Sequence, residues 1–350
     1  MPPLLGKRVE DNMGLNGKTS NSAHNTQPPP YYLLPITCPL CDAMASQLML
    51  RPRRIRRAYL AGNLFTWLPI WTGTAGPDTL PGVRPMDVGM LHCGACGFTE
   101  SQQNFRGFDR VRYPNIRQLK NLLLEKRVIR RGPYPRLVQG ISTEKPTDSS
   151  VLRVHLAALI LQLLPHPESR DFVRIAHCAL RLARLFLDRL HYGGPSWDVA
   201  DTVSLPTHSP IADRLRPTLE ELKSVKEVWS VIPLGYTEAL ELALNAYGLA
   251  LERGFPGQNP LRRLEVRYSR IQIIGELGDL QKTSGLLEDL SRRAEELIAN
   301  WGDLSATGPH SEDDRDGAGS SEEQLIRLHH FSRTVGDLHR AVRKQLAAAA

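Results

Sequence analysis

Four of the five cysteines in this 350-residue chain form two short pairs, with the sequences Cys-Pro-Leu-Cys at 38–41 and Cys-Gly-Ala-Cys at 93–96. A Cys-x-x-Cys turn directs two thiolates to one point, and two such turns complete the tetrahedral four-sulfur shell that zinc prefers. The residue after each second cysteine, Asp42 or Gly97, tolerates the left-handed backbone in which such turns often end. We therefore predict a structural zinc ion bound by Cys38, Cys41, Cys93 and Cys96.

The four cysteines also allow other interpretations. Two disulfides would require an oxidising compartment, whereas the chain starts without the apolar run and small-residue cleavage site of a secretory signal. Iron fits the same four-sulfur shell, and a thiol redox pair at Cys38 and Cys41 is a third interpretation. His92 offers a substitute ligand, but in a strand it points away from its neighbour Cys93, so we expect it to face solvent.

Positive charge is concentrated in the part of the chain that carries the cysteine pairs. Residues 31–140 contain 16 Lys and Arg but only 6 Asp and Glu, whereas the whole chain has a net charge of +7. Five arginines lie close together, at Arg51, Arg53, Arg54, Arg56 and Arg57. Such a run is usually a solvated face, but basic side chains beside a zinc turn also bind phosphate groups in nucleic-acid-binding proteins. Nucleic acid is therefore one candidate partner of this region.

Composition and periodicity divide the chain into six parts. We expect a disordered N-terminus at 1–30, a β zinc-ribbon-like module at 31–110, and a basic helix with a linker at 111–149. A helical tetratricopeptide-like domain at 150–303 follows, then an acidic flexible linker at 304–323 and a C-terminal amphipathic helix at 324–350. The predicted fold class is mainly α, with the small β module preceding the helical domain.

The passage around the second cysteine pair resembles a known bacterial family. Residues 85–98 read Pro-Met-Asp-Val-Gly-Met-Leu-His-Cys-Gly-Ala-Cys-Gly-Phe, and Glu100 and Phe105 follow. Together with the pair at 38–41, this passage resembles domain of unknown function 2225, which combines two such cysteine turns with tetratricopeptide-like helices. The resemblance implies that the four cysteines are metal ligands. It implies no activity, because none is assigned to the family.

Apolar residues from 151 to 301 recur with a period close to 3.6, which predicts helices at 151–164, 168–191, 237–253, 261–276 and 284–301. In the second helix an apolar stripe lies opposite a polar face of Arg170, Arg174, His177, Arg181, Arg184 and Asp188. Cys178 lies between the two faces and is expected to pack as a small hydrophobe. Residues 193–217 should form a loop, after which Thr218 should open a helix with a capping box.

The C-terminal helix should bury one face. Its apolar residues follow one another at spacings of three and four, a pattern typical of helices that pack along a seam; they are Leu328, Phe331, Val335, Leu338 and Val342. Two partners for this seam are open, namely a second copy of the chain in a homodimer, or the helical domain of the same chain. Folding back is favoured, because the stripe is shorter than the three to four heptads of a convincing coiled coil.

No catalytic motif is present. The sequence lacks a Gly-x-Ser-x-Gly turn, a glycine-rich phosphate loop, a His-Glu-x-x-His pair and a dinucleotide fingerprint. Four cysteines also fill the coordination shell of zinc and leave no position for a reacting water. We therefore expect a non-catalytic protein whose helical domain binds a protein or peptide, with nucleic-acid binding as the alternative. No apolar run is long enough to span a membrane, and we expect a soluble cytoplasmic protein.

Overall fold

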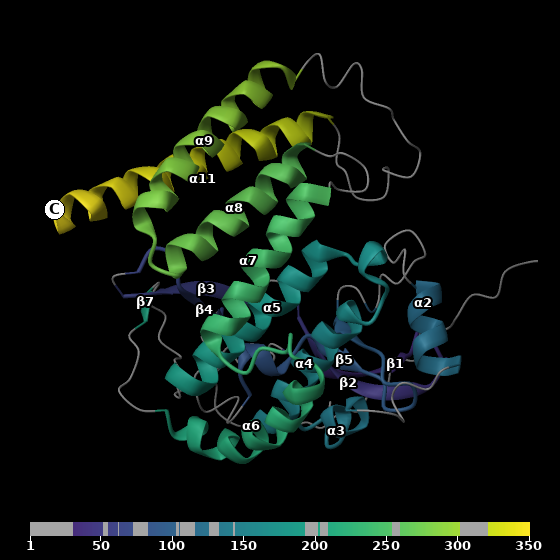
Figure 1. Cartoon of the computed structure of the whole chain (residues 1–350). Helices are drawn as coiled ribbons and strands as arrows, with labels where there is room; N and C mark the ends of the chain where they lie inside the picture. Colours follow the sequence, from purple (N-terminus) through teal and green to yellow (C-terminus); the bar gives the residue numbers. More distant parts are fainter. Residues whose placement is uncertain are drawn as a thin grey trace, which may run out of the picture.

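The computed structural model describes residues 31–51, 55–61, 63–72, 83–102, 105, 116–125, 133–142, 144–192, 202–203, 209–253, 260–301 and 321–350. The expectations for residues 1–30, for Arg53 and Arg54, and for most of the linker at 304–323 concern residues outside this set. Within it, the chain is mainly α-helical, with a small β part that comes before the helical domain (Figure 1). The predicted fold class is therefore confirmed.

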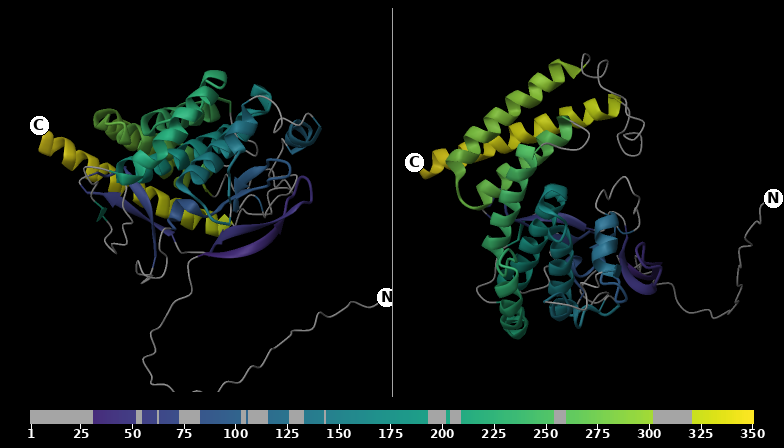
Figure 2. Two further views of the ribbon diagram at one scale, coloured as in Figure 1. Left: turned by 90° about the horizontal axis from the view of Figure 1, so that it is seen from below. Right: turned by 45° about the vertical axis from the view of Figure 1, so that its right-hand side comes forward.

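The strands of the described residues form three small sheets. Two of these are antiparallel hairpins, made by β1 (Tyr31–Thr37) with β2 (Met44–Leu50), and by β5 (Met90–His92) with β6 (Thr99–Ser101). The third sheet has the order β4 (Trp67–Trp71), β3 (Ile55–Leu60), β7 (Thr202–Val203), with the first pair antiparallel and the second parallel. Seen from below, the strands lie along one side of the helices (Figure 2).

The longer helices pack side by side in the order α4, α5, α7, α8, α9, α11. Two short helical segments precede them, α2 (Ile116–Lys120), which continues as a π-helix over Asn121–Glu125, and α3 (Tyr134–Val138). The longer helices are α4 (Asp148–Leu163), α5 (Phe172–Phe186, followed by a π-helix over Leu187–Tyr192), α6 (Pro210–Val228), α7 (Tyr236–Arg253), α8 (Pro260–Glu276), α9 (Leu280–Ala299) and α11 (Ser321–Ala349). Side chains of Thr147, Asp171 and Asp279 cap α4, α5 and α9 by accepting a bond from a first-turn amide.

α6 corrects the predicted loop at 193–217. The helix begins at Pro210, where a proline ring fits the first turn, and it runs through Pro217, which forgoes one backbone hydrogen bond. Thr218 lies inside the helix, where its hydroxyl donates to Ser149 Oγ at 3.0 Å instead of capping a helix start. The prolines are tolerated because the apolar side of α6 is buried in the main core, through Ile211, Leu215, Leu222 and Val225.

The two largest hydrophobic cores among the described residues hold most of these elements together. The main core joins α4, α5, α6 and α7 to the cysteine-bearing hairpins and includes Cys38, Cys93, Cys96 and Phe98. The second core holds α8, α9 and α11 and includes Phe65 from the β3–β4 connection. A Cβ atom on Gly275 of α8 would lie 2.6 Å from the Phe65 ring, so this close approach requires glycine. The β part is therefore packed into the helical array at both cores.

α11 folds back on the helical domain. Leu328, Val335 and Val342 are fully buried in the second core, and Phe331 and Leu338 pack beside them. The main neighbour of α11 is α9, and it also contacts α8. The apolar stripe, one candidate for a dimer seam, is thus covered within the chain.

The polar face predicted for α5 is largely covered as well. Arg184 and Asp188 are buried, because β4 and the segment before β5 lie against this face. Arg184 forms an ion pair with Glu276 of α8, and its guanidinium carbon lies 4.7 Å from the centre of the Trp67 ring of β4. Asp188 accepts a hydrogen bond from Arg84 at 3.1 Å.

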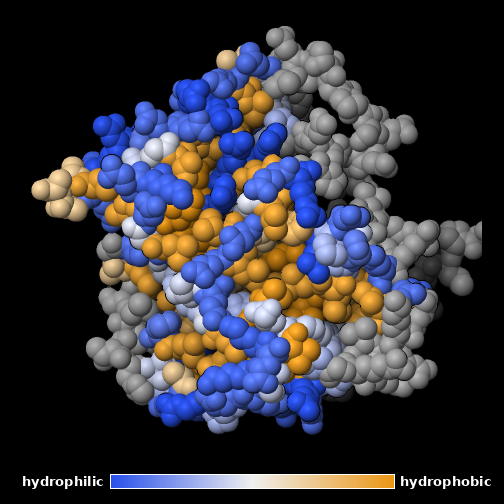
Figure 3. All heavy atoms as spheres, in the orientation of Figure 1, coloured by the Kyte–Doolittle hydropathy of each residue, from blue (hydrophilic) through white to orange (hydrophobic). Residues whose placement is uncertain are grey.

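By contrast, the outer face of α7 is hydrophilic, and hydrophobic side chains lie on both sides of it where α7 meets α5 and α8 (Figure 3).

Candidate metal centre

The four predicted cysteines come together at the ends of the two hairpins. Their sulfur atoms all lie within 4.8 Å of one another, with Cys38 Sγ 3.6 Å from Cys96 Sγ and Cys41 Sγ 3.5 Å from Cys93 Sγ. A tetrahedral ion with metal–sulfur bonds of about 2.3 Å places its sulfurs about 3.8 Å apart, whereas a disulfide requires about 2.05 Å. The cluster is therefore compatible with a structural metal ion, and its all-sulfur donor set suits zinc or iron.

Both cysteine turns have the same backbone hydrogen bonds. The amide of the first cysteine donates to the carbonyl five residues later, at 2.9 Å in one turn and 2.8 Å in the other. The carbonyl of that cysteine accepts from the amide four residues later, at 3.0 Å and 2.7 Å. Asp42 and Gly97 have φ values of 59° and 77°, so both adopt the left-handed backbone that the sequence predicts. Each hairpin thus ends in a turn that orients two thiols.

Two glutamine side chains join the hairpins, although these belong to separate sheets. Gln47 of β2 donates through Nε2 to His92 O at 2.9 Å and accepts from His92 N at 3.3 Å. Gln102, directly after β6, accepts from Leu50 N at 2.7 Å and donates to Leu50 O at 3.0 Å. Each side-chain amide has a donor and an acceptor and so takes the place of a strand partner. The two cysteine pairs are held in position relative to each other in this way.

The cluster is buried between the hairpins and the helices. Cys38, Cys93 and Cys96 are at most 4% exposed, and Cys41 is partly buried. Tyr134 of α3 is completely buried and donates its hydroxyl to Gly97 O at 2.8 Å, so a helix holds the second turn. A metal ion enclosed by four sulfurs at this depth offers no coordination position to a substrate.

The close approach of the sulfurs couples the ionisation of the thiols. A hydrogen bond with Cys38 lowers the pKa of the Cys93 thiol. The same hydrogen bond raises the pKa of Cys38 to about 12, and hydrogen bonds with Cys38 and Cys93 raise the pKa of Cys96. Four thiolates at this spacing repel one another, and a divalent cation between them removes that repulsion. The cluster has the electrostatic character of a cation site.

His92 is buried, which corrects the predicted solvent-facing position. Only 6% of the residue is exposed, because every residue of the short strand β5 is covered, on both faces of the strand. Its Nδ1 lies 2.8 Å from Thr99 Oγ1, and burial lowers its pKa to about 4, which keeps the ring neutral. The ligand cluster found among the described residues consists of the cysteines and does not include His92.

The arginine run is described at three of its five positions. Arg51 follows β2 and lies over the Tyr32 ring, with Cζ 4.9 Å from the ring centre. Arg57 is exposed on β3 and lies over Trp67 at 4.4 Å, and Arg56 beside it is partly buried. Two of the three thus stack on aromatic rings, which leaves those ring faces unavailable to nucleic-acid bases.

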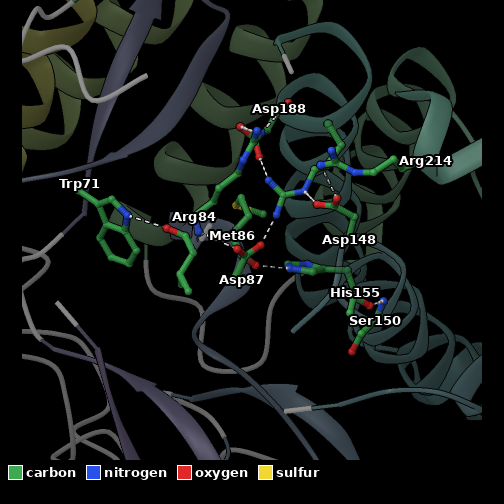
Figure 4. Close-up of polar contacts among 12 residues, drawn as sticks. Trp71, Arg84, Met86, Asp87, Asp148, Ser150, His155, Asp188 and Arg214 are labelled. Atoms are coloured by element: carbon green, nitrogen blue, oxygen red, sulfur yellow. Dashed lines mark hydrogen bonds and ion pairs between the residues drawn. The ribbon is translucent and has the colours of Figure 1, made fainter. Parts of the chain in front are cut away.

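A buried network of charged side chains joins the segment before β5 to the helices (Figure 4). Arg189 is 2% exposed and forms ion pairs with Asp87, Asp148 and Asp188. Arg84 pairs with Asp188 at 3.1 Å. The sequence gives no signal for this network beyond the charged face of an amphipathic helix, because Asp87 and Arg189 lie far apart along the chain.

Titratable groups in this network are shifted by burial. His155 of α4 is buried and its Nε2 bonds to Met86 O at 3.2 Å, and burial lowers its pKa to about 3. Burial raises the pKa of Asp87 to about 6, against the opposing effect of Arg189. The network therefore holds a neutral imidazole beside paired arginines and carboxylates, and it joins the chain that leads into the second cysteine turn to the helices.

Comparisons with protein-family models, with curated proteins and with solved structures gave no match to this chain. Among the described residues, no helix is long and apolar enough to cross a membrane. The fold and the cysteine cluster define the class: a mainly α protein that carries a buried four-cysteine centre compatible with a metal ion.

Proposed function

We propose that this chain is a non-catalytic zinc protein in which the metal fixes the β hairpins to a helical array and the whole serves to bind a protein or peptide. The observation that carries the proposal is that the cysteines lie in the same core as α4, α5 and α7. Zinc bound at this point would stabilise hairpins and helices together. The closed sulfur shell favours a structural role for the ion over a catalytic one.

The packing of the helices supports the interaction role. α7, α8 and α9 each pack against two neighbouring helices, as expected for stacked helical hairpins that present extended binding surfaces. The tetratricopeptide-like character of these helices stays a prediction, as does the resemblance to the bacterial family. A reducing compartment such as the cytoplasm would keep the four thiols available to the metal.

Elemental analysis of the purified chain tests the metal. We expect about one equivalent of zinc in the wild type and very little in Cys96→Ser, because three sulfurs do not complete the shell. Cys178→Ser is the matched control and should keep its zinc. Cys178 belongs to α5, where it packs against the main core, and it is not in the cluster. Iron at the same ratio would mean that the same four cysteines bind iron instead of zinc. A wild-type chain without metal would refute the proposal.

Nucleic-acid binding is the second candidate, favoured by the 16 basic against 6 acidic residues at 31–140. It predicts nucleic acid that co-purifies with the chain and dissociates with rising salt. Replacing the basic run by glutamine, at Arg53, Arg54, Arg56 and Arg57, would then abolish binding and leave the zinc content unchanged. A purified chain free of nucleic acid that is not retained on immobilised single-stranded DNA at low salt would decide against this candidate.

A further inference from the structure

One edge of the β1–β2 hairpin has no strand partner among the described residues. On the other side of the hairpin, the Gln102 side chain binds both backbone groups of Leu50 in β2. In an antiparallel pair, the amide and carbonyl of one residue point to the same side, and successive residues alternate. The backbone amide and carbonyl of Leu50 point away from β1, so those of its partner Tyr31 point away from β2. The same holds for every second residue of β1 up to Thr37. These residues face the open edge.

Pro35 limits where another strand can pair with this edge. Its backbone nitrogen and carbonyl face the open edge, but proline has no amide hydrogen to donate. Leu33 is the last residue before it that presents both an outward amide and an outward carbonyl, and 55% of Leu33 is exposed. An unpaired edge with an exposed apolar side chain is a template for another strand. The stretch available for pairing is therefore Tyr31–Leu33.

A groove adjoins this same stretch. It has a volume of about 630 Å³, and Tyr31, Leu33, Leu48 and Val83 form its apolar lining. Arg51 and Lys145 also line it beside the carboxylate of Glu144, so the charge of its described lining residues is positive on balance. A groove of this size has room for apolar side chains of a bound peptide, and its charge favours an acidic residue beside them.

We propose that the Tyr31–Leu33 edge and the adjoining groove bind an extended segment of another polypeptide, which adds a strand to β1 and carries an apolar and an acidic side chain into the groove. Hydrogen bonds to the Leu33 backbone supply affinity, and the groove supplies specificity. This inference rests on the proposed role in protein binding and deepens it by naming the surface and the form of the partner. It places that surface at the β1 edge, whereas the sequence pointed to the helices.

Two other occupants suit the edge less well. The chain's own residues 1–30 lead into β1 through Pro28, Pro29 and Pro30, which have no amide hydrogens for strand pairing. A second copy paired antiparallel about Leu33 would set Pro35 of each copy opposite Tyr31 of the other, where a hydrogen bond is lost. A separate peptide can end opposite Leu33 and so need not pair with Pro35, and it need not enter the edge through a run of prolines.

The test selects peptides from a phage-displayed library of random dodecapeptides on the zinc-loaded full chain. We expect enriched peptides with alternating apolar residues and at least one acidic residue. Leu33→Pro removes the outward amide without breaking a bond of the β1–β2 pair, and it should weaken binding by about tenfold or more, as should Leu33→Lys. Ile326→Lys is the matched control, because Ile326 is 62% exposed on α11, and it should leave binding unchanged.

Failure to enrich any peptide, or equal affinity of the wild type and both Leu33 variants, would overturn the proposal. Protection of the Leu33 amide from hydrogen exchange in the free monomer would overturn it in favour of residues 1–30, and a dimer that Leu33→Pro dissociates would overturn it in favour of a second copy. Zinc content is measured on the same samples. A metal-free chain counts against the proposed function, whereas a zinc-loaded chain that binds no peptide counts against this inference alone.

Discussion

α5 and α11 have similar sequence patterns and different surroundings. Both combine an apolar stripe with a charged face. In α11 the stripe is buried and the charged residues are mostly exposed, as the pattern predicts. In α5 the stripe is buried too, but Arg184 on the charged face lies between Trp67 and Glu276. The apolar period of a helix therefore predicts its inner side, and other parts of the chain decide whether its polar side meets water.

The charged face of α5 is an interface because partners of opposite charge cover it. Arg184 pairs with Glu276, and Arg174 lies 3.7 Å from Glu100 of β6. Such partners offset the loss of hydration that burial imposes on a charge. The buried part of the α11 interface is apolar, and its ion pair of Arg327 with Glu265 of α8 is exposed. The cysteine-bearing side should thus be sensitive to the loss of single charges, and the α11 side to the loss of apolar volume.

The largest effect should follow from Arg189→Met. The substitution leaves Asp87, Asp148 and Asp188 without their shared cation in a buried place, and we expect a loss of about 3–5 kcal/mol in the free energy of unfolding by urea. Arg214→Met is the matched control, because Arg214 pairs with the same Asp148 but its side chain is 63% exposed. The control should lose less than about 1 kcal/mol. Similar losses in both variants would show that the burial of the Arg189 guanidinium does not decide the effect.

Leu328→Ala should be the corresponding change on the α11 side. It removes a fully buried side chain from the second core, and we expect a loss of about 3 kcal/mol. The zinc content should stay at the wild-type value, because Leu328 and the cysteines lie in different cores. Ile326→Ala, at an exposed position two residues away, should change stability by less than about 0.5 kcal/mol. Zinc loss in Leu328→Ala would show that the cores are not separate.

Part of the pH dependence should come from the α4 and α5 side, beside the contribution of the buried His92 of β5. Burial lowers the pKa of His155 to about 3, so its contribution to stability is present above about pH 6.5 and is lost as the pH falls. Burial raises the pKa of Asp87 to about 6, so its contribution has the opposite sign, and stability falls as the pH rises from about 4 to 6.

When the pH falls from 6.5 to 5, the unfolding free energy of the wild type should decrease by about 2 kcal/mol more than that of His155→Gln. It should decrease by less than that of Asp87→Asn. Urea unfolding at both pH values measures this difference, with zinc content checked in each sample. If the unfolding free energy of His155→Gln falls in parallel with that of the wild type, the buried imidazole is not the cause of the loss at low pH.

The smallest effect should follow from Arg57→Gln. Arg57 is exposed, and its guanidinium carbon lies 4.4 Å from the centre of the Trp67 ring, so its loss should lower the unfolding free energy by about 0.5–1 kcal/mol. Arg340→Gln on α11 removes an exposed ion pair with Asp337 and should change stability by less than about 0.5 kcal/mol. Thermal unfolding of the two variants ranks them, and the reverse order would contradict the role given to Trp67.

Local features of the fold and the site are predictable from the sequence. The four cysteines and the left-handed Asp42 follow from a few adjacent residues, because a Cys-x-x-Cys turn is a local structure. α8 starts one residue before the predicted range and ends with it, since its apolar period is clear. The start of α6 is not predictable in this way, because burial in the main core decides it against the signal of Pro217.

Contacts between distant segments are the part that the sequence does not reveal. Gln47 and Gln102 look like ordinary polar residues, and only the fold brings them to the backbones of His92 and Leu50. The burial of His92 has the same origin, because the alternation of a strand describes two faces and does not say that both are covered.

Hydrogen exchange of the backbone amides, before and after removal of the metal by a chelator, tests the central claim most directly. The claim is that the cysteine centre and α5 form one cooperative unit while α11 belongs to another. We predict that loss of zinc speeds exchange in α4 and α5 by about tenfold or more, with a much smaller change in α11. Unchanged exchange in α5, or an equal increase in α5 and α11, would contradict the account.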